Sequence, residues 1–231
     1  MAYTVTHLGG LHTVTGSCHL LQTRGLNIMV DCGLAQGDDD VAPIETWSVS
    51  PSRIDYLFLT HAHIDHIGRV PELIQKGFRG QIICTHATKA LIHPMLQDAL
   101  SFSDITEQQA AKLLETIDEL SWGFEYDQPF DLESEIRFKF GRTGHILGSC
   151  FIRFDIPNNS STTRNPVILS PSKDAPRTSV VYSGDLGAYN TPILPDPDIP
   201  EPCDLLVLES TYGDRNHEDR RQRIQRLGEA L

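Results

Sequence analysis

Four side chains of the kinds that bind metal ions fall within six residues, in the segment HAHIDH at positions 61–66. They are His61, His63, Asp65 and His66. On an extended segment, His61 and His63 would point the same way, so both imidazoles could bind one ion. Imidazole and carboxylate ligands together suit zinc or a similar transition ion. Burying such groups without partners costs about 1–3 kcal/mol each, so the pattern favours a metal site over packing.

Two later segments, both flanked by glycine, each offer one more ligand-type side chain. His145 lies in TGHILGSC, before an expected strand, and Asp185 lies in VVYSGDLG, just after one. Glycine lets the backbone turn sharply and approach other groups closely. Each signal is weak alone, but their arrival in order after HAHIDH strengthens the prediction of a metal site.

The elements expected around these residues mix strands with helices. We expect strands at 3–8, 18–23, 27–31, 54–60, 81–85, 136–140, 150–156, 180–183 and 205–208, and helices at 69–76, 87–100 and 105–120. The uninterrupted apolar run at 54–60 is typical of a strand buried on both faces, and HAHIDH follows it directly. In the last helix, Thr106 and Gln109 are spaced for a capping box. The order indicates an α/β fold with its site at the carboxyl ends of strands.

Composition limits the class of protein. The 231 residues are 39% hydrophobic and 22% charged, which is an ordinary globular composition. No long apolar run or signal-like start is present, and the five scattered cysteines include no C-x-x-C pair. We therefore expect a cytoplasmic protein with no membrane span. The net charge of −12 argues against a general nucleic-acid binder.

Several features have a structural interpretation. The polar segment 157–179 is interpreted as a flexible surface loop; the alternative is that its basic residues Arg164, Lys173 and Arg177 contact a polyanion. The final segment, GDRNHEDRRQRIQRLGEAL, predicts a charged helix. The remaining histidines are interpreted as structural or ordinary polar residues; they are His7, His12, His19, His86, His93 and His217.

Taken together, the motifs resemble the β-CASP branch of the metallo-β-lactamase superfamily, which processes RNA and DNA. The resemblance rests on HAHIDH, GHILGS, SGDLG and ESTYGD, with TVTGSCHLL and VDCGLAQG upstream, and runs from about residue 4 to residue 216. It implies an αββα sandwich that holds two zinc ions. By this resemblance, His61, His63 and His145 would hold the first ion. Asp65 and His66 would hold the second, and Asp185 would bridge the pair.

The resemblance also implies roles for two further carboxylates. Asp31, in IMVDCG, would orient the metal ligands from behind them. Glu209, in ESTYGD, matches an acidic motif, and with Asp65 it is a candidate catalytic residue. The implied function is a dinuclear zinc phosphodiesterase that cleaves RNA, with DNA as the alternative, by attack of a metal-activated hydroxide on phosphorus. By the same resemblance, the GLHTVTGS loop, with His12 and His19 around it, would border the site. A homodimer is one candidate assembly.

The resemblance further implies more chain than these 231 residues. The family inserts a domain after the ESTYGD region and then supplies two more histidines, whereas no histidine follows His217 here. We expect residues 1–214 to be the N-terminal part of a metallo-β-lactamase domain and 215–231 to lead into an absent β-CASP domain. Such a piece should hold the second ion weakly and be a poor nuclease alone. Two alternatives stay open: a related hydrolase of thioesters or other esters, and a non-catalytic RNA-processing subunit.

Overall fold

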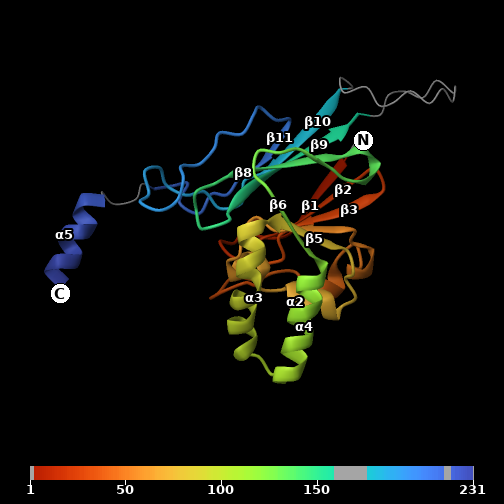
Figure 1. Ribbon diagram of the computed structural model, residues 1–231, viewed down its shortest axis with the longest axis horizontal. Helices are drawn as coiled ribbons and strands as arrows, with labels where there is room; N and C mark the ends of the chain where they lie inside the picture. Colours follow the sequence, from red (N-terminus) through yellow and green to blue (C-terminus); the bar gives the residue numbers. More distant parts are fainter. Residues whose placement is uncertain (1–2, 159–175, 216–219, 231) are drawn as a thin grey trace.

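The chain folds into two stacked β-sheets with helices against the outer face of one of them, in a computed structural model that describes residues 3–158, 176–215 and 220–230 (Figure 1). The first sheet has six strands in chain order: β1 (Tyr3–Gly9), β2 (Cys18–Thr23), β3 (Leu26–Val30), β4 (Tyr56–Phe58), β5 (Gln81–Thr85) and β6 (Ser121–Phe124). Strands β1 to β3 are antiparallel neighbours, and β3 to β6 run parallel. The predicted mixed α/β architecture is confirmed.

The second sheet has five strands, in the spatial order β11-β10-β9-β8-β7. Their bounds are β7 (Phe130–Asp131), β8 (Arg137–Arg142), β9 (Cys150–Pro157), β10 (Arg177–Tyr182) and β11 (Leu205–Val207). Only β10 and β11 are parallel neighbours; the other pairs are antiparallel. The loop between β8 and β9 and the end of β10 reach the same edge of the sandwich as the end of β4.

The helices are α1 (Ile64–Ile67), α2 (Val70–Gln75), α3 (His86–Ser101), α4 (Glu107–Leu120) and α5 (Arg220–Ala230), with 3₁₀ turns at Ile44–Thr46, Pro51–Arg53 and Glu133–Glu135. In Figure 1, α2, α3 and α4 lie together against the six-stranded sheet. Within the described ranges the five-stranded sheet carries no matching helical layer, so these residues form an αββ portion of the expected αββα sandwich. No described helix has the length and apolar character needed to cross a membrane.

Two hydrophobic layers hold the sandwich together. Leu57 and Phe58 are neighbours in β4 and are both fully buried, yet Leu57 faces the helices and Phe58 faces the second sheet. Phe58 packs edge-on against Phe138 and Phe154, at centroid distances of 5.0 and 4.8 Å. Burying each such side chain contributes about 1.5–3 kcal/mol. The prediction of a strand buried on both faces is confirmed.

Strand and helix ends differ from the predicted ones for local reasons. The ladder of β4 ends early because Thr60 N donates to the Asp31 carboxylate (2.8 Å) instead of to a strand neighbour. The predicted helix at 105–120 begins at Glu107, where the capping box is present as predicted. Its two bonds are Thr106 N to Gln109 Oε1 (2.9 Å) and Gln109 N to Thr106 Oγ1 (3.3 Å). The short strands β6 and β7 were not predicted.

The polar segment at 157–179 is described only at its ends. Residues 159–175, which include Arg164 and Lys173, lie outside the described part of the chain, as does His217. Arg177 begins β10, and its Nη1 donates to the backbone carbonyls of Glu135 (2.8 Å) and Asp155 (3.0 Å). Arg177 therefore joins strands, which argues against the polyanion interpretation for this residue.

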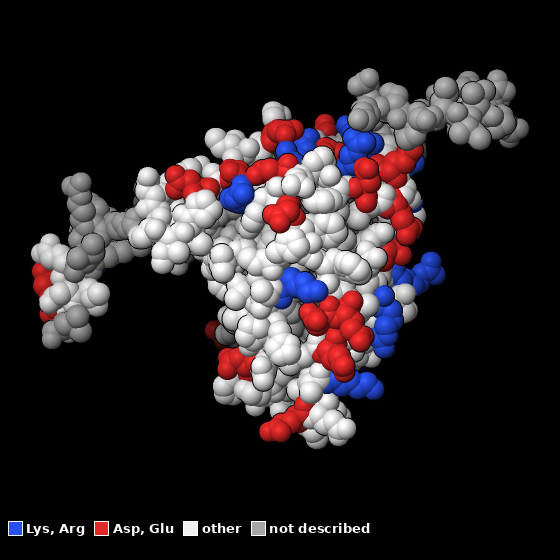
Figure 2. All heavy atoms as spheres, in the orientation of Figure 1, with Lys and Arg blue, Asp and Glu red and all other residues white. Residues whose placement is uncertain are grey.

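Acidic side chains outnumber basic ones in this protein, and the charges on its surface are mixed. Asp and Glu number 31 against 19 Lys and Arg, and the two signs are interspersed on the face in Figure 2, without a broad basic patch. Of the five cysteines, Cys18, Cys32, Cys84 and Cys150 are buried. They act as small apolar side chains in the core, as the sequence indicates.

Candidate metal centre

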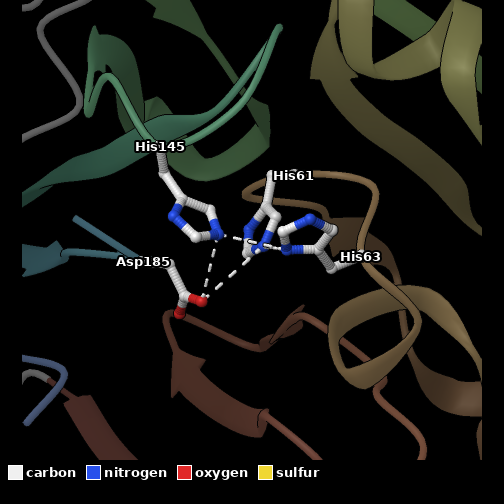
Figure 3. Close-up of side chains that lie close together, drawn as sticks. All are labelled: His61, His63, His145 and Asp185. Atoms are coloured by element: carbon white, nitrogen blue, oxygen red, sulfur yellow. Dashed lines mark hydrogen bonds and ion pairs between the residues drawn. The ribbon is translucent and has the colours of Figure 1, made fainter. Parts of the chain in front are cut away.

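Four of the candidate ligands, His61, His63, His145 and Asp185, point toward one another where strands of both sheets end (Figure 3). His61 and His63 follow β4, and α1 carries Asp65 and His66. The five-stranded sheet contributes His145, from the loop between β8 and β9, and Asp185, which follows β10. The six residues come from three segments of the chain, 61–66 and the segments around His145 and Asp185, and folding brings them together.

A first group contains His61, His63, His145 and Asp185, whose candidate ligand atoms all lie within 4.8 Å of one another. His63 Nδ1 is 3.0 Å from His61 Nε2 and 3.1 Å from His145 Nε2. One imidazole nitrogen offers either one proton or one lone pair, so His63 Nδ1 cannot satisfy both neighbours. A cation that accepts all three lone pairs would satisfy them, so these donors fit a metal ion.

A second group contains Asp65, His66 and Asp185. His66 Nε2 lies 3.2 Å from Asp185 Oδ1 and 3.8 Å from Asp65 Oδ2. The other oxygen of Asp185, Oδ2, lies 3.4 Å from His145 Nε2 and 3.9 Å from His61 Nε2. Asp185 thus directs one oxygen toward each group, which is the arrangement a bridging ligand requires.

Asp31 lies behind the second group and is 1% exposed. Its carboxylate accepts hydrogen bonds from His66 Nδ1 (2.7 Å), Thr60 N (2.8 Å), Thr60 Oγ1 (2.9 Å) and Ser17 Oγ (3.2 Å). The bond from His66 Nδ1 turns Nε2 toward Asp65 and Asp185, which is the orientation a ligand needs. Asp31 also has φ 58°, a left-handed conformation at the strand end. The geometry supports an orienting role for Asp31.

Burial and charge set different protonation states for the histidines. Burial, helped by the neighbouring imidazoles of His66 and His145, lowers the pKa of His61 well below its usual value, so His61 is neutral. Burial also acts to lower the pKa of His66, but the carboxylates of Asp31 and Asp185 outweigh it and raise that pKa to about 10. His66 is therefore cationic in the metal-free protein, and a metal ion would have to displace a proton there.

Glu209 lies at the rim of the site and is only partly buried. Its Oε1 accepts a hydrogen bond from Leu186 N (2.9 Å), and its Oε2 accepts one from Thr211 N (3.1 Å). The carboxylate therefore holds the segment that carries Asp185. The ESTYGD motif alone does not predict these hydrogen bonds to the backbone. A catalytic role for Glu209 stays a prediction.

A cavity of about 680 Å³ adjoins the site. His12 and His19 line it, as the sequence predicts for residues that border the site. His19 contacts His7, with 2.9 Å between the Nδ1 atoms, and stacks on Tyr182 at a centroid distance of 5.9 Å. Among the described residues the lining holds His66 and no Lys or Arg, together with four carboxylates: Asp31, Asp39, Asp185 and Glu209. His86 lies elsewhere, at the start of α3.

Sequence reasoning missed two residues that hold Asp31. Ser17 and Thr60 both donate to its carboxylate, but hydroxyl residues are common and no spacing rule singles these two out. Their positions beside recognised motifs, TGSCH and LTHAH, were the available signals. The choice of partner depends on how the two strands pack, which the sequence does not display.

Comparisons with known proteins agree with this geometry. The sequence model of the metallo-beta-lactamase superfamily matches residues 13–230. Ribonuclease TTHA0252 of Thermus thermophilus is 34% identical over 98% of this chain and 48% of its own length. Cleavage and polyadenylation specificity factor 73 of Drosophila melanogaster is 31% identical, over 95% of this chain and 30% of its own length. The chain thus spans about half or less of the length of these curated relatives.

Solved structures provide a likeness of fold. A metallo-beta-lactamase from Cronobacter sakazakii has a TM-score of 0.50 and 21% sequence identity, and the match covers 84% of this chain and 68% of that one. A protein from Enterococcus faecalis has a TM-score of 0.52 at 18% identity, over 80% of this chain and 44% of its own. At such identities the likeness concerns the arrangement of strands and helices alone.

Proposed function

Because this chain belongs to the metallo-β-lactamase superfamily, we propose that it forms the metal-binding part of a ribonuclease of the β-CASP type. The fold class expected from the motifs is confirmed. One observation carries the proposal: six side chains of the types that bind metal ions converge in two groups that share Asp185. The curated relatives include a ribonuclease and several endoribonucleases, which supports RNA as the substrate.

We infer two divalent cations, with zinc as the preferred ion because imidazoles and carboxylates supply the donors. The first would be held by His61, His63 and His145, the second by Asp65 and His66, and Asp185 would face both. Two such ions, when bound, lower the pKa of water to about 7 and stabilise charge on a phosphoryl group.

The protein's own residues would fix the geometry of that chemistry. Asp31 keeps a proton on His66 Nδ1 so that Nε2 stays available, and Glu209 holds the backbone beside Asp185. His61 and His66 are buried, whereas His63, Asp65 and Asp185 are partly exposed, so the substrate would approach on their side. Asp65, whose Oδ2 lies 3.8 Å from His66 Nε2, would also take up a proton during cleavage.

The acidic surface sets a condition on this proposal. Neither the cavity lining nor the face in Figure 2 offers a basic patch that would attract a phosphate backbone. The attraction would come from the bound cations and from chain beyond these residues. We therefore retain the division into 1–214, in the metallo-β-lactamase domain, and 215–231, leading into a β-CASP domain. This division is consistent with the greater length of the relatives.

The same acidity favours a second candidate function. The cavity carries four carboxylates and several apolar side chains, with no Lys or Arg among the described residues, and such a lining suits an uncharged ester better than a polyanion. The superfamily fold and a cation pair would also serve a hydrolase of thioesters or other esters. A non-catalytic RNA-processing subunit is the third possibility, although all six candidate ligands are present.

One experiment separates these functions. The protein at its full natural length, loaded with zinc, is incubated with labelled single-stranded RNA, with single-stranded DNA and with an activated thioester. We expect cleavage of the RNA, and a loss of about a hundredfold or more in His63→Ala and Asp185→Ala. Thioester hydrolysis with intact RNA would support the ester hydrolase. A metal-loaded protein that turns over none of these substrates would support the subunit.

The proposal also covers the cellular location of the protein and its oligomeric state. We propose a cytoplasmic protein because the buried thiols suit a reducing compartment. A homodimer stays a candidate assembly, and light scattering of the purified protein would measure it.

A further inference from the structure

The loop that carries His145 is bonded to the first turn of α3 through two buried threonine hydroxyls. Thr85 Oγ1 donates to the carbonyl oxygen of Gly148 (2.8 Å), and Thr88 Oγ1 donates to the same oxygen (2.9 Å). Both threonines are at most 1% exposed. We propose that Thr88, supported by Thr85, is a positioning residue that fixes His145 in the metal centre; the role of His145 as a ligand rests on the proposed function.

The two hydroxyls can make both bonds at once. A carbonyl oxygen has two lone pairs, and each hydroxyl has one proton to donate. Thr85 Oγ1 also accepts a bond from Thr88 N (3.1 Å), which caps the start of α3. Its proton has two acceptors within reach, Gly148 O at 2.8 Å and Thr88 Oγ1 at 3.0 Å, and the carbonyl oxygen is the nearer one. Gly148 is buried, and a buried carbonyl held by two donors is strongly fixed in place.

The link from Gly148 to His145 is short and rigid. Ser149 Oγ accepts bonds from His145 N (3.1 Å) and Ile146 N (3.3 Å), and Ser149 N donates back to Ile146 O (3.1 Å). At Gly148 a Cβ atom would lie 2.5 Å from Thr88 N, and φ is +87°, so only glycine allows this approach. A shift of Gly148 relative to α3 would therefore carry His145 with it.

The bonds from Thr85 and Thr88 to Gly148 O form a clamp that also joins the two halves of the sandwich. His61 and His63 follow β4 of the six-stranded sheet, which the α3 layer covers, whereas His145 belongs to a loop of the five-stranded sheet. The same loop is also bonded to its own sheet, by Gly187 N to Thr143 O (2.8 Å), and its end is bonded to the first sheet, by Cys150 N to Thr60 O (2.9 Å). The threonine bonds are side-chain contacts that, together with this backbone bond, set the position of His145 relative to His63, where the two nitrogens are 3.1 Å apart.

Thr88→Val tests the clamp because valine keeps the shape of threonine and removes the hydroxyl donor. We expect the affinity for zinc, measured by chelator competition, to fall about tenfold, and the visible spectrum of the cobalt-loaded protein to change. Thr88→Ser restores the donor and should bind zinc within about threefold of the unmodified protein. Ser121→Ala is the matched control, because it removes a buried hydroxyl-to-carbonyl bond (Ser121 Oγ to Ile117 O, 2.6 Å) outside both ligand groups. This control should lower the melting temperature and leave zinc affinity unchanged.

Hydrogen exchange in the metal-free protein gives a readout that does not depend on metal binding. Thr88→Val should speed exchange at the amides of His145 and Ile146, and Ser121→Ala should not. Unchanged zinc affinity and unchanged exchange in Thr88→Val would overturn the clamp, as would an equal loss in Thr88→Ser. If the unmodified protein binds no zinc, the proposed function fails, and the exchange rates alone then decide whether the clamp exists.

Discussion

Asp31 is a single buried carboxylate on which the second ligand group depends. It receives donors from three other residues, and the bond from His66 Nδ1 is the shortest of them at 2.7 Å. In Asp31→Asn the amide can still accept from Thr60, but its NH₂ group then faces His66 Nδ1. His66 would place its proton on Nε2, the nitrogen that has to bind the metal.

We therefore expect Asp31→Asn to lower metal affinity about 10–100-fold, as chelator competition would measure. Asp204→Asn is a suitable control, since Asp204 accepts from Ser179 N and Ser179 Oγ (both 2.8 Å) at the far end of β10. Equal affinity in Asp31→Asn and the unmodified protein would show that Asp31 does not orient the ligand.

His19 makes stability depend on pH. Burial lowers its pKa from 6.5 to about 4, so the folded protein keeps His19 neutral while the unfolded chain gains a proton below pH 6.5. The stabilisation that comes from the low pKa of His19 is fully present above pH 6.5 and is lost as the pH falls toward 4. Between pH 7 and pH 5 the free energy of unfolding should fall by about 2 kcal/mol for this reason. Urea denaturation of the metal-free protein should show a steeper loss than in His19→Gln; parallel curves would exclude the effect.

For single residues, the sequence predicted which side chains come together, but it did not predict most of the hydrogen bonds that position them. HAHIDH, His145 and Asp185 could be found because ligand-type residues stood at expected strand ends. Ser17, Thr60, Thr85 and Thr88 could not, because a hydroxyl finds its partner only after the strands and helices have packed. Such partners are set by tertiary contact and leave no local pattern.

Among the elements, the turn after β3 lies directly against α1. Cys32 N donates to His66 O (2.8 Å), and a Cβ atom at Gly33 would lie 1.6 Å from Asp65 O. No side chain fits there unless α1 moves, and α1 carries Asp65 and His66. The close approach thus sets the position of the second ligand group relative to the first sheet.

We expect Gly33→Ala to destabilise the protein by about 2 kcal/mol or more and to weaken metal binding as well. Gly25→Ala is the comparison, because nothing lies within 4 Å of its Cβ position and its cost is only the left-handed backbone, about 1 kcal/mol. Thermal melting and zinc titration measure both effects. A Gly33→Ala protein with normal metal binding would contradict the link between this turn and the site.

Element prediction succeeded where local signals were strong. The capping box and apolar stripe identified α4, and the apolar run identified β4. The strands β6 and β7, of four and two residues, have no comparable signal and exist through pairing with β5 and β8. The early end of β4 came from the Asp31 carboxylate, a contact that no window of sequence contains.

For the whole molecule, the two ligand groups differ in strength. The first offers four donors and the second three, one of them a histidine that holds a proton in the metal-free protein. This inequality is consistent with the expectation, from the resemblance, that the second ion is held weakly. The two sheets each supply part of the first group, so a correctly packed sandwich is a condition for binding.

The most direct test of the central claim is an anomalous-difference map from crystals of the zinc-loaded protein. We expect two peaks about 3.5–4 Å apart, one at each ligand group, with Asp185 between them. The stronger peak should lie about 2.0–2.1 Å from nitrogens of His61, His63 and His145, and the weaker one beside Asp65 and His66. A map without zinc at this position, or with zinc bound only elsewhere, would contradict it.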